Sequence, residues 1–564
     1  MEALDWLVIG VFFLALIGII VWVVRQKQND SADYFLGGRD ATWLAIGASI
    51  FASNIGSEHL IGLAGAGASS GMAMAHWEIQ GWMILILGWV FVPFYTRSMV
   101  YTMPEFLERR YNPQSRTILS VISLVSYVLT KVAVTVYAGG LVFQQVFGIK
   151  ELWGIDFFWI AAIGLVVLTA LYTIFGGMKS VPYTSVLQTP ILLLGSLIIL
   201  VLGFKELGGW DEMMRVCGAV TVNDYGDTMT NLIRSNDDAN FPWLGALIGS
   251  AIIGFWYWCT DQFIVQRVLS GKNEMEARRG TIFGAYLKLL PVFLFLIPGM
   301  IAFALHQKYI GAGGEGFLPM LANGTANADA AFPTLVAKLL PAGVKGLVVC
   351  GILAALMSSL ASLFNSSAML FTIDFYKRFK PETPEKKLVG IGQIATIVIV
   401  VLGILWIPIM RSVGDVLYTY LQDVQSVLAP GIAAAFLLGI CWKRTSAQGG
   451  MWGLISGMVI GLTRLGAKVY YSNAGEVADS TFKYLFYDMN WLFFCGWMFL
   501  FCIIVVIVVS LATEAPTAEK IQGLVFGTAT KEQKAATRAS WNHWDIIHTV
   551  IILAITAAFY WYFW

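Results

Sequence analysis

The sequence contains few charged residues, and this scarcity limits the kind of protein that it can encode. Only 13% of the 564 residues are Asp, Glu, Lys or Arg, whereas 58% are hydrophobic and the mean hydropathy is +0.72. Soluble domains carry about 25% charged residues. We therefore expect most of the chain to lie in lipid, as an all-α polytopic membrane protein. The formal net charge of +1 gives no indication of a nucleic-acid or acidic partner.

Cysteine and the common catalytic motifs are also scarce. Of the six cysteines, only Cys217 lies in a long loop, and the other five fall in or beside apolar segments, so no disulfide framework is expected. The chain has no Cys and His spacing typical of a metal site, no phosphate-binding loop and no nucleotide motif. These absences argue against an enzyme and against a pump driven by ATP. An ion gradient is then the expected energy source.

Hydrophobic runs dominate the sequence, and fourteen of them are long enough to cross a bilayer, which takes about 20 residues. The expected spans are 5–25, 41–66, 73–96, 117–146, 155–175, 181–204, 241–266, 280–306, 343–376, 388–410, 413–440, 446–467, 489–512 and 546–564. Because Glu2 and Asp5 precede the first apolar run without a basic residue, we expect a retained span and not a cleaved signal. Lys and Arg gather in alternate connections, 23 against 10 in the others. The positive-inside rule then places both termini outside the cell membrane.

Two of the expected spans contain residues that a plain membrane helix excludes. Residues 50–59 include Asn54 and Glu58, and residues 253–262 include Gly254 and Asp261. Unsatisfied backbone groups in hydrocarbon cost several kcal/mol each, so such stretches are tolerated only where they line a wet cavity or bind a ligand. Broken helices at matching places in two halves of a chain are typical of secondary transporters with a substrate site at the membrane midplane.

The broken stretches open two halves of five spans each, residues 41–204 and 241–440. An odd number of spans gives the two halves opposite orientations, as inverted repeats require. Residues 5–25 then form an extra N-terminal helix and residues 446–564 form C-terminal helices, all within a single transmembrane domain. Three polar connections are long, namely 206–240 and 307–342 on the outside and 513–545 on the inside.

Charged side chains inside spans are costly and usually mark function or a paired structural role. Glu78 and Lys288 stand out, and Trp77, Tyr257 and Trp258 lie close to the broken stretches. Carboxylate, ammonium and amide groups beside flat aromatic rings suit a sugar, whose hydroxyls need directed hydrogen bonds and whose C–H surface packs on rings. The alternative for any single amide is a structural hydrogen bond between helices.

A segment of small residues at 354–362 contains the serine pair Ser358 and Ser359. Small residues by themselves favour close packing of membrane helices. Paired hydroxyls also suit a small hard cation such as sodium, whose other ligands would be backbone carbonyls freed where the helix at 41–66 unwinds. The residues alone leave both interpretations open.

Longer motifs carry a family resemblance. DYFLGGR at 33–39 and GASIFASNIGS at 47–57 resemble the sodium/solute symporter family. WYWCTDQ at 256–262 and FLLG at 436–439 resemble its sodium/glucose cotransporter branch, and the similarity extends from about residue 30 to residue 445. The resemblance implies the leucine-transporter fold, with five-plus-five inverted repeats, two broken helices and added flanking helices.

The resemblance also implies roles for particular residues. Carried over by motif, the sodium ligands are the carbonyls of Ala52, Ile55 and Ala355 and the hydroxyls of Ser358 and Ser359. The expected sugar contacts are Asn54, His59, Glu78, Tyr257, Trp258, Lys288 and Gln422. Leu63, Trp77 and Tyr418 match an outer hydrophobic gate, and Tyr257 matches an inner gate that stacks on the sugar ring.

Four positions depart from the patterns of the family. Gly81 and Gly254 stand where the bacterial galactose carrier has polar sugar contacts, so the hydroxyl contacts are expected to differ. Ser185 stands where the family often has Asp, and Ala361 stands where members that bind two sodium ions carry Thr. Both of the latter departures favour one sodium ion per sugar.

The residues and the resemblance together predict a sodium-coupled symporter that imports a glucose- or galactose-like monosaccharide by alternating access. Glu78, Lys288 and Gln422 favour neutral polyhydroxylated solutes, which leaves myo-inositol or another neutral solute as an alternative. A third hypothesis is a sugar-gated sensor without net transport. Gln422 argues against the sensor, because sensor-like relatives carry an acid at that position. The expected partners are sodium, a small solute and the lipid bilayer.

Overall fold

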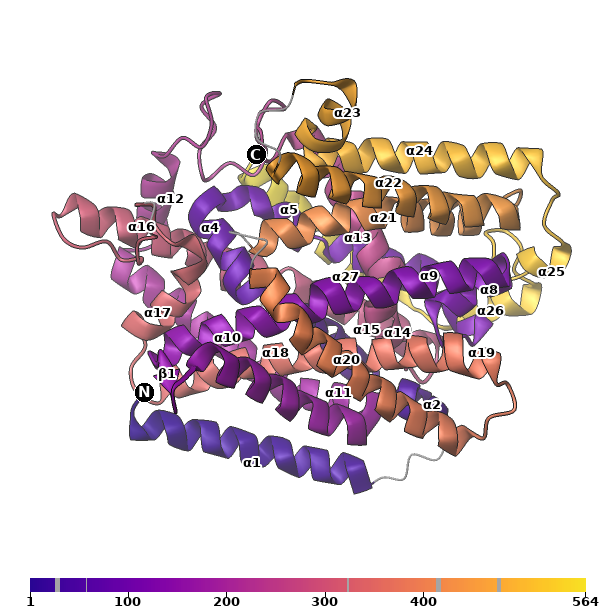
Figure 1. Ribbon diagram of the computed structural model, residues 1–564, viewed down its shortest axis with the longest axis horizontal. Coiled ribbons are helices and arrows are strands. Elements are labelled where there is room, and N and C mark those ends of the chain that lie inside the picture. The colour runs from indigo at the N-terminus through magenta and orange to yellow at the C-terminus, as the bar shows by residue number, and fades with distance from the viewer. Residues whose placement is uncertain (26–30, 57, 322–323, 412–416, 474–477) are drawn as a thin grey trace.

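The computed structural model describes residues 1–25, 31–56, 58–321, 324–411, 417–473 and 478–564. Within these residues the chain is almost entirely helical, and most of the long helices run side by side along the long axis of the view (Figure 1). β1 (Glu151–Leu152) and β2 (Ile155–Asp156) form a short antiparallel hairpin in which Glu151 lies opposite Asp156.

The helices of the first part of the chain are α1 (Ala3–Arg25), α2 (Ser31–Leu36), α3 (Trp43–Asn54), α4 (Ala64–Ser70), α5 (Ala75–Glu78), α6 (Gly81–Ile86), α7 (Val92–Ser98), α8 (Met103–Arg110), α9 (Pro113–Ser126), α10 (Ala133–Phe147), α11 (Phe157–Leu207) and α12 (Trp210–Gly218). Those of the second part are α13 (Trp243–Gly254), α14 (Gln262–Leu269), α15 (Glu274–Lys288), α16 (Ile297–Gly311), α17 (Ala331–Leu339), α18 (Val344–Met369), α19 (Lys377–Phe379), α20 (Glu385–Arg411), α21 (Leu417–Cys441), α22 (Ala447–Asn473), α23 (Thr481–Lys483), α24 (Trp491–Ala512), α25 (Ala518–Ile521), α26 (Lys531–Ala539) and α27 (His543–Tyr562). Wider π-helical turns adjoin several of them, at Glu58–Leu63, Leu87–Phe91, Tyr127–Val132, Phe255–Thr260, Val292–Leu296, Leu370–Tyr376 and Tyr484–Asp488, and 3₁₀ turns lie at Gly37–Arg39, Gly71–Met74 and Ala328–Ala330.

In the described part of the chain, 11 helical segments are long and apolar enough to cross a membrane. Helices also cover the remaining expected spans, but these are less regular. The span expected at 41–66 is interrupted after α3, and the span expected at 117–146 contains the π-helical turn Tyr127–Val132. The span expected at 446–467 belongs to α22, which carries Arg464 and Lys468 in its second half.

The spans expected at 155–175 and 181–204 both belong to α11, one helical element of 51 residues. Tyr172 OH donates to the carbonyl oxygen of Met357 at 2.8 Å, and Ser185 Oγ lies 3.4 Å from Ser358 Oγ. In a straight helix, Tyr172 and Ser185 would stand about 20 Å apart. Because both reach adjacent residues of α18, the element doubles back between them, and its two apolar parts lie alongside the same helix.

Both helix interruptions expected from the sequence are present. α3 ends at Asn54, and Ile55 has extended backbone with ψ 104°. α13 and its π-helical turn end at Thr260, and Asp261 has extended backbone with ψ 128° before α14 begins. A Cβ atom at Gly56 would lie 2.6 Å from Glu58 Oε2, so only glycine fits the first break without displacing that side chain.

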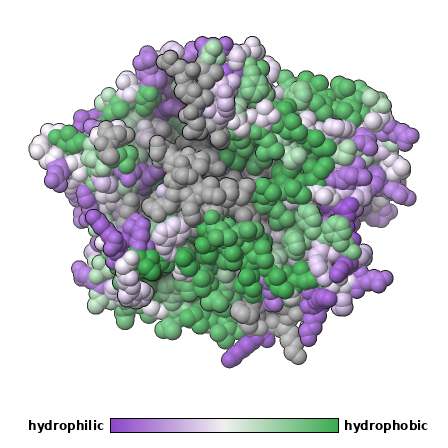
Figure 2. All heavy atoms as spheres, viewed as in Figure 1, coloured by the Kyte–Doolittle hydropathy of each residue, from purple (hydrophilic) through white to green (hydrophobic). Residues whose placement is uncertain are grey.

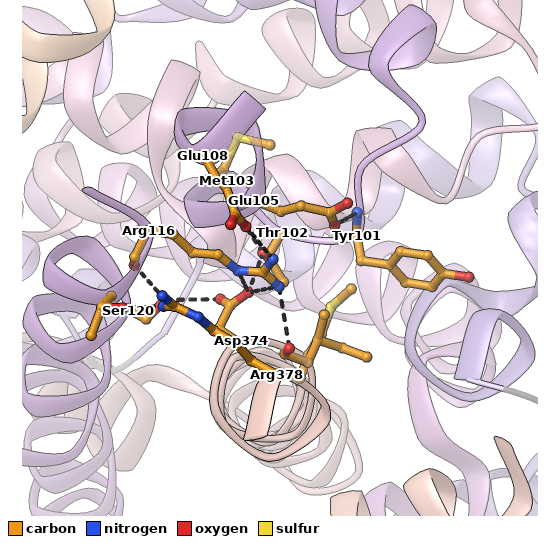
Figure 3. Close-up of polar contacts among 12 residues, drawn as sticks. Tyr101, Thr102, Met103, Glu105, Glu108, Arg116, Ser120, Asp374 and Arg378 are labelled. Atoms are coloured by element: carbon orange, nitrogen blue, oxygen red, sulfur yellow. Dashed lines mark hydrogen bonds and ion pairs between the residues drawn. The ribbon is translucent and has the colours of Figure 1, made fainter. Parts of the chain in front are cut away.

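One end of the bundle carries a buried ionic network (Figure 3). Asp374 accepts hydrogen bonds from Thr102 Oγ1 and Ser120 Oγ, each at 2.9 Å, and forms an ion pair with Arg116 at 2.6 Å. Arg116 also pairs with Glu108 at 2.6 Å. The network joins α8 and α9 to the turn that follows α18. These are connections that the charge bias assigns to the inside.

The polar stretch 513–545, expected on the inside, packs at this same end. Lys520 Nζ donates to the carbonyl oxygen of Glu108 at 2.9 Å, and Phe526 N donates to that of Ile440 at 2.9 Å. The grouping of the expected inner connections at one end agrees with the charge pattern.

Both termini lie at the other end, toward the left of Figure 1. Leu232 N donates to the carbonyl oxygen of Phe563 at 3.0 Å. Asp5 Oδ1 accepts from Gly343 N at 2.7 Å and Gly346 N at 2.9 Å, at the start of α18. The two ends of the chain therefore share a side of the bundle with Leu232, in the connection 206–240, and with the start of α18.

Candidate functional site

The two helix breaks meet at one cavity with a volume of about 50 Å³. Its walls are formed by Asn54, Glu58, His59, Trp77, Glu78, Gln80, Ile253, Gly254, Tyr257, Trp258, Lys288, Gln422 and Gln425. All seven residues expected to contact a sugar are in this set. The volume is below the ~300–1,000 Å³ of sites that enclose small molecules, so a ring-sized solute requires the walls to move apart.

Lys288 stands at the centre of the polar contacts in the cavity. Its Nζ atom lies 2.6 Å from Glu78 Oε2, 3.1 Å from Asn54 Oδ1 and 5.4 Å from the centroid of the Trp258 ring. Asn54 Nδ2 donates in turn to Tyr257 OH at 3.1 Å. These contacts join the ends of α3, α5 and α15 to the second broken helix. A buried ion pair is costly unless further hydrogen bonds satisfy it, and here Asn54 supplies one.

Three other wall residues present polar atoms that lack hydrogen bonds within the described chain. The atoms are the two ring nitrogens of His59, Nε1 of Trp77 and Oε1 of Gln422. His59 Nε2 does lie 3.3 Å from Glu78 Oε2, close enough for attraction although not aligned as a hydrogen bond. Buried polar atoms without a partner are rare in native proteins. Their convergence on one cavity indicates a polar ligand.

Two amides of the cavity wall were not among the expected sugar contacts. Gln80 Oε1 accepts from Trp258 Nε1 at 3.2 Å, and its Nε2 donates to the carbonyl oxygen of Ser250 at 2.9 Å. A Cβ atom at Gly254 would lie 2.6 Å from Gln80 Oε1, so the glycine makes room for this amide. Gln425 follows Gln422 by three residues on α21, and this i, i+3 spacing could have identified it.

Of the expected gate residues, Trp77 and Tyr257 line the cavity. Leu63 is buried in the π-helical turn after the first break. Trp77 stacks on Trp491, with ring centroids 5.5 Å apart and planes 24° apart, and contacts Phe241 edge-on. The side chain of Tyr418 lies outside the described residues. Trp491 and Phe241 are additions that no sequence motif indicated.

Behind Tyr257, a second buried ion pair joins the fourth expected span to the second break. Lys131 Nζ lies 2.5 Å from Asp261 Oδ2, and the phenol of Tyr127 donates to Asp261 Oδ1. The same ammonium lies 4.7 Å from the ring centroids of Tyr257 and Phe263. The pair thus fixes Asp261, the residue with extended backbone. Its ammonium lies against the ring of Tyr257, the expected inner gate.

The serine pair of α18 lies against the first break. Ser359 Oγ donates to the carbonyl oxygens of Ser53 at 2.9 Å and Ile55 at 3.2 Å. Ser358 Oγ approaches Ser185, while Ala52 and Ala355 are buried on the same two helices. The carbonyl of Ser53 was not expected in this role. Which carbonyls turn toward Ser359 depends on the dihedral angles at the break, which a sequence does not state.

Oxygen atoms of this kind fit sodium. Hydroxyl and carbonyl oxygens from an unwound helix are the ligands that coupling cations use in broken-helix transporters. No group of three or more His, Cys, Asp or Glu residues suited to a transition metal occurs within the described ranges. The two carbonyls also flank Asn54, whose side chain enters the solute cavity.

Comparison with known proteins shows the family of the chain and its fold. Residues 34–457 match the sodium:solute symporter family. The chain is 37% identical to the mouse sodium/myo-inositol cotransporter 2 over 94% of its own length and 80% of that protein, and 36% identical to the zebrafish sodium/glucose cotransporter 4 over 92% and 80%. The fold matches that of a Na⁺-coupled sialic acid symporter in a substrate-bound outward-open state, with a TM-score of 0.73, 22% identity and coverage of 92% of this chain and 99% of the other. The chain belongs to the sodium:solute symporter family.

Proposed function

We propose that the protein is a sodium-coupled symporter that imports a neutral monosaccharide by alternating access. The observation that carries the proposal is the shared position of the two sites. Ser359 contacts the carbonyls on either side of Asn54, and the Asn54 side chain contacts Lys288 and Tyr257 in the solute cavity. A cation held at those carbonyls would fix Asn54 in place. Sodium then favours the conformation that binds solute, which is the differential affinity that coupling requires.

The charges of the cavity support a neutral solute. The Glu78 carboxylate and the Lys288 ammonium are 2.6 Å apart and offset one another. Each retains hydrogen-bonding capacity for a hydroxyl group, and charge-assisted bonds of this kind contribute about 1.5–3 kcal/mol. A carboxylate-bearing solute would instead compete with Glu78 for Lys288. Trp77, Trp258 and Tyr257 supply aromatic surface for the C–H face of a sugar ring.

The inner gate of this proposal is Tyr257, held by Asn54 on one side and by the Lys131–Asp261 pair beneath it. Release of solute toward the inside requires Tyr257 to leave this position. When sodium departs, the carbonyls beside Asn54 no longer coordinate a cation. The support that Asn54 gives Tyr257 then weakens. Sodium release would thereby precede solute release.

We further propose the architecture of the leucine-transporter fold in full, with fourteen spans, inverted repeats at 41–204 and 241–440 and both termini outside the cell membrane. Support comes from the two breaks at matching positions and from the basic connections gathered at the end opposite the termini. Labelling of single cysteines introduced near Glu2 and in 513–545 with a membrane-impermeant reagent tests the orientation. Labelling of intact cells only at the second position would overturn it.

We propose one sodium ion per solute. The hydroxyl of Ser185 donates to the carbonyl of Val181 and approaches Ser358, and it carries no charge. Ala361 offers no side-chain oxygen. A second cation there would meet the first across about 10 Å, where repulsion at an effective dielectric of ~20 is about 1.7 kcal/mol. Reversal potentials at varied gradients give the ratio, and a value near two would refute this assignment.

A second candidate solute is myo-inositol, favoured because relatives with that name match nearly the whole chain. Hexoses and inositol present the same chemistry, a neutral ring with hydroxyls around it. A competition panel of glucose, galactose, myo-inositol and a sugar acid, measured against sodium-driven uptake in proteoliposomes, separates the two. Strong inhibition by the sugar acid alone would reject both candidates.

A further inference from the structure

An apolar groove of about 650 Å³ opens on the surface of the bundle between α9, the π-helical turn Leu370–Tyr376 and α20. Phe371, Ile394 and Val398 line it and are 43%, 62% and 50% exposed. The face drawn in Figure 2 has a broad hydrophobic area across its middle, with hydrophilic residues toward the left and right edges. In a membrane the groove therefore faces acyl chains.

The length of the groove along α20 matches the hydrocarbon thickness of one membrane leaflet. On α20 it extends from Ile391 to Leu402, which is about 16 Å along a helix. The hydrocarbon of a single leaflet is about 15 Å thick, half of the ~30 Å core. Lys387 lies one helical turn before Ile391, on the same face of α20. The apolar stripe thus ends in a cation at the end of the bundle where the basic connections gather.

A second hollow of about 470 Å³ adjoins the groove at this end, and Tyr376 lines both. Its walls include Lys380 and Lys387, with Glu382 as the acidic residue among them. Neither lysine forms an ion pair within the described part of the chain. The neighbouring Lys377, by contrast, pairs with Glu385 at 3.1 Å. The segment 377–387 holds five basic and two acidic residues, so its net charge is positive.

From this juxtaposition we propose that the protein binds one glycerophospholipid with an anionic head group, whose acyl chain occupies the groove and whose phosphate lies between Lys380 and Lys387. The length of the groove matches that of an acyl chain. The positive charges of the two lysines complement the negative charge of the phosphate and head group. Anionic lipids attract basic residues at the cytoplasmic surface. The inference does not depend on which solute the protein carries.

Native mass spectrometry of the purified full-length protein tests the proposal, with phosphatidylglycerol and phosphatidylcholine of equal chain length as probes. We expect phosphatidylglycerol to stay bound at collision energies that strip phosphatidylcholine. Lys380→Gln and Lys387→Gln should each lower the binding constant for phosphatidylglycerol about fivefold, the effect of one basic residue at a membrane surface. Lys386→Gln is the matched control, since Lys386 is also exposed but does not line the hollow.

Val398→Trp fills the groove at an exposed position and should remove the lipid without removing a charge. Melting curves of each variant in detergent confirm that it is folded. Equal retention of the two lipids, or equal loss in the Lys386 and Lys387 variants, would overturn the proposal. Loss on Val398→Trp alone would show a chain groove without head-group recognition, which also contradicts it.

Discussion

Removal of the carboxylate at Glu78 should have two separable effects. In Glu78→Gln the ammonium of Lys288 keeps its buried position but loses the anion 2.6 Å away. Breaking one side of a buried ion pair costs about 3–5 kcal/mol. Part of this cost appears as reduced thermal stability. The solute also loses a charge-assisted hydrogen bond of about 1.5–3 kcal/mol, so its half-saturation concentration should rise by at least tenfold, since each factor of ten is about 1.4 kcal/mol.

The double variant Glu78→Gln with Lys288→Met separates the two effects. It removes both charges, so no unpaired buried charge remains, which is the cause of the large penalty when one partner alone is removed. We expect its melting temperature to return toward that of the native protein while solute affinity stays low. Thermal melting in detergent and concentration-dependent uptake in proteoliposomes measure the two quantities. Recovery of both in the double variant, or no change in either for Glu78→Gln, would refute the assignment of this pair to solute binding.

Three further changes test other parts of the account. Ser359→Ala should raise the half-saturation for sodium about tenfold and alter solute selectivity little, because a hydroxyl beside two carbonyls is lost; a sodium titration of uptake decides this, and an unchanged value places the cation elsewhere. Lys131→Met should slow turnover about tenfold and Lys131→Arg should restore it, because the cation supports the helix break at Asp261; equal rates for the two variants would show that the charge has no such role. Burial raises the pKa of Asp329 from an ordinary 3.8 to about 6, so the folded protein holds this proton more tightly than the unfolded chain. The resulting stabilisation is complete below about pH 4 and is lost as the pH rises through 6; Asp329→Asn should flatten this slope in melting temperature, and an unchanged slope would assign it to another group.

The positions of the two breaks were predictable because their signal is local. Asn54, Gly56 and Asp261 stand inside runs that are otherwise apolar, and the cost of burying such groups in lipid fixes where the helix must open. The clustering of Glu78 and Lys288 was predicted through resemblance to a family. Their ion pair at 2.6 Å joins residues 210 positions apart, which periodicity alone does not bring together.

Other features depend on tertiary packing that a single sequence does not encode in a readable form. The ion pair of Lys131 with Asp261 links two helices with no shared motif. The carbonyls of Ser53 and Ile55 lie at the break, where Ile55 adopts extended backbone, and both accept from Ser359, which is 306 and 304 positions away. Some expected spans are also less regular than the hydrophobic runs predict. A π-helical turn and an interrupted helix shorten their continuous apolar helices.

Symport itself is tested most directly by uptake into proteoliposomes that contain only the purified protein. Labelled glucose, galactose and myo-inositol would each be offered with an inward sodium gradient, with equal sodium on both sides, and with potassium in place of sodium. We expect at least one of these neutral solutes to accumulate transiently above its external concentration with the gradient alone, and Ser359→Ala to require more sodium for the same rate. Uptake that is equal in all three conditions, or binding of solute without any accumulation, would contradict sodium-coupled symport.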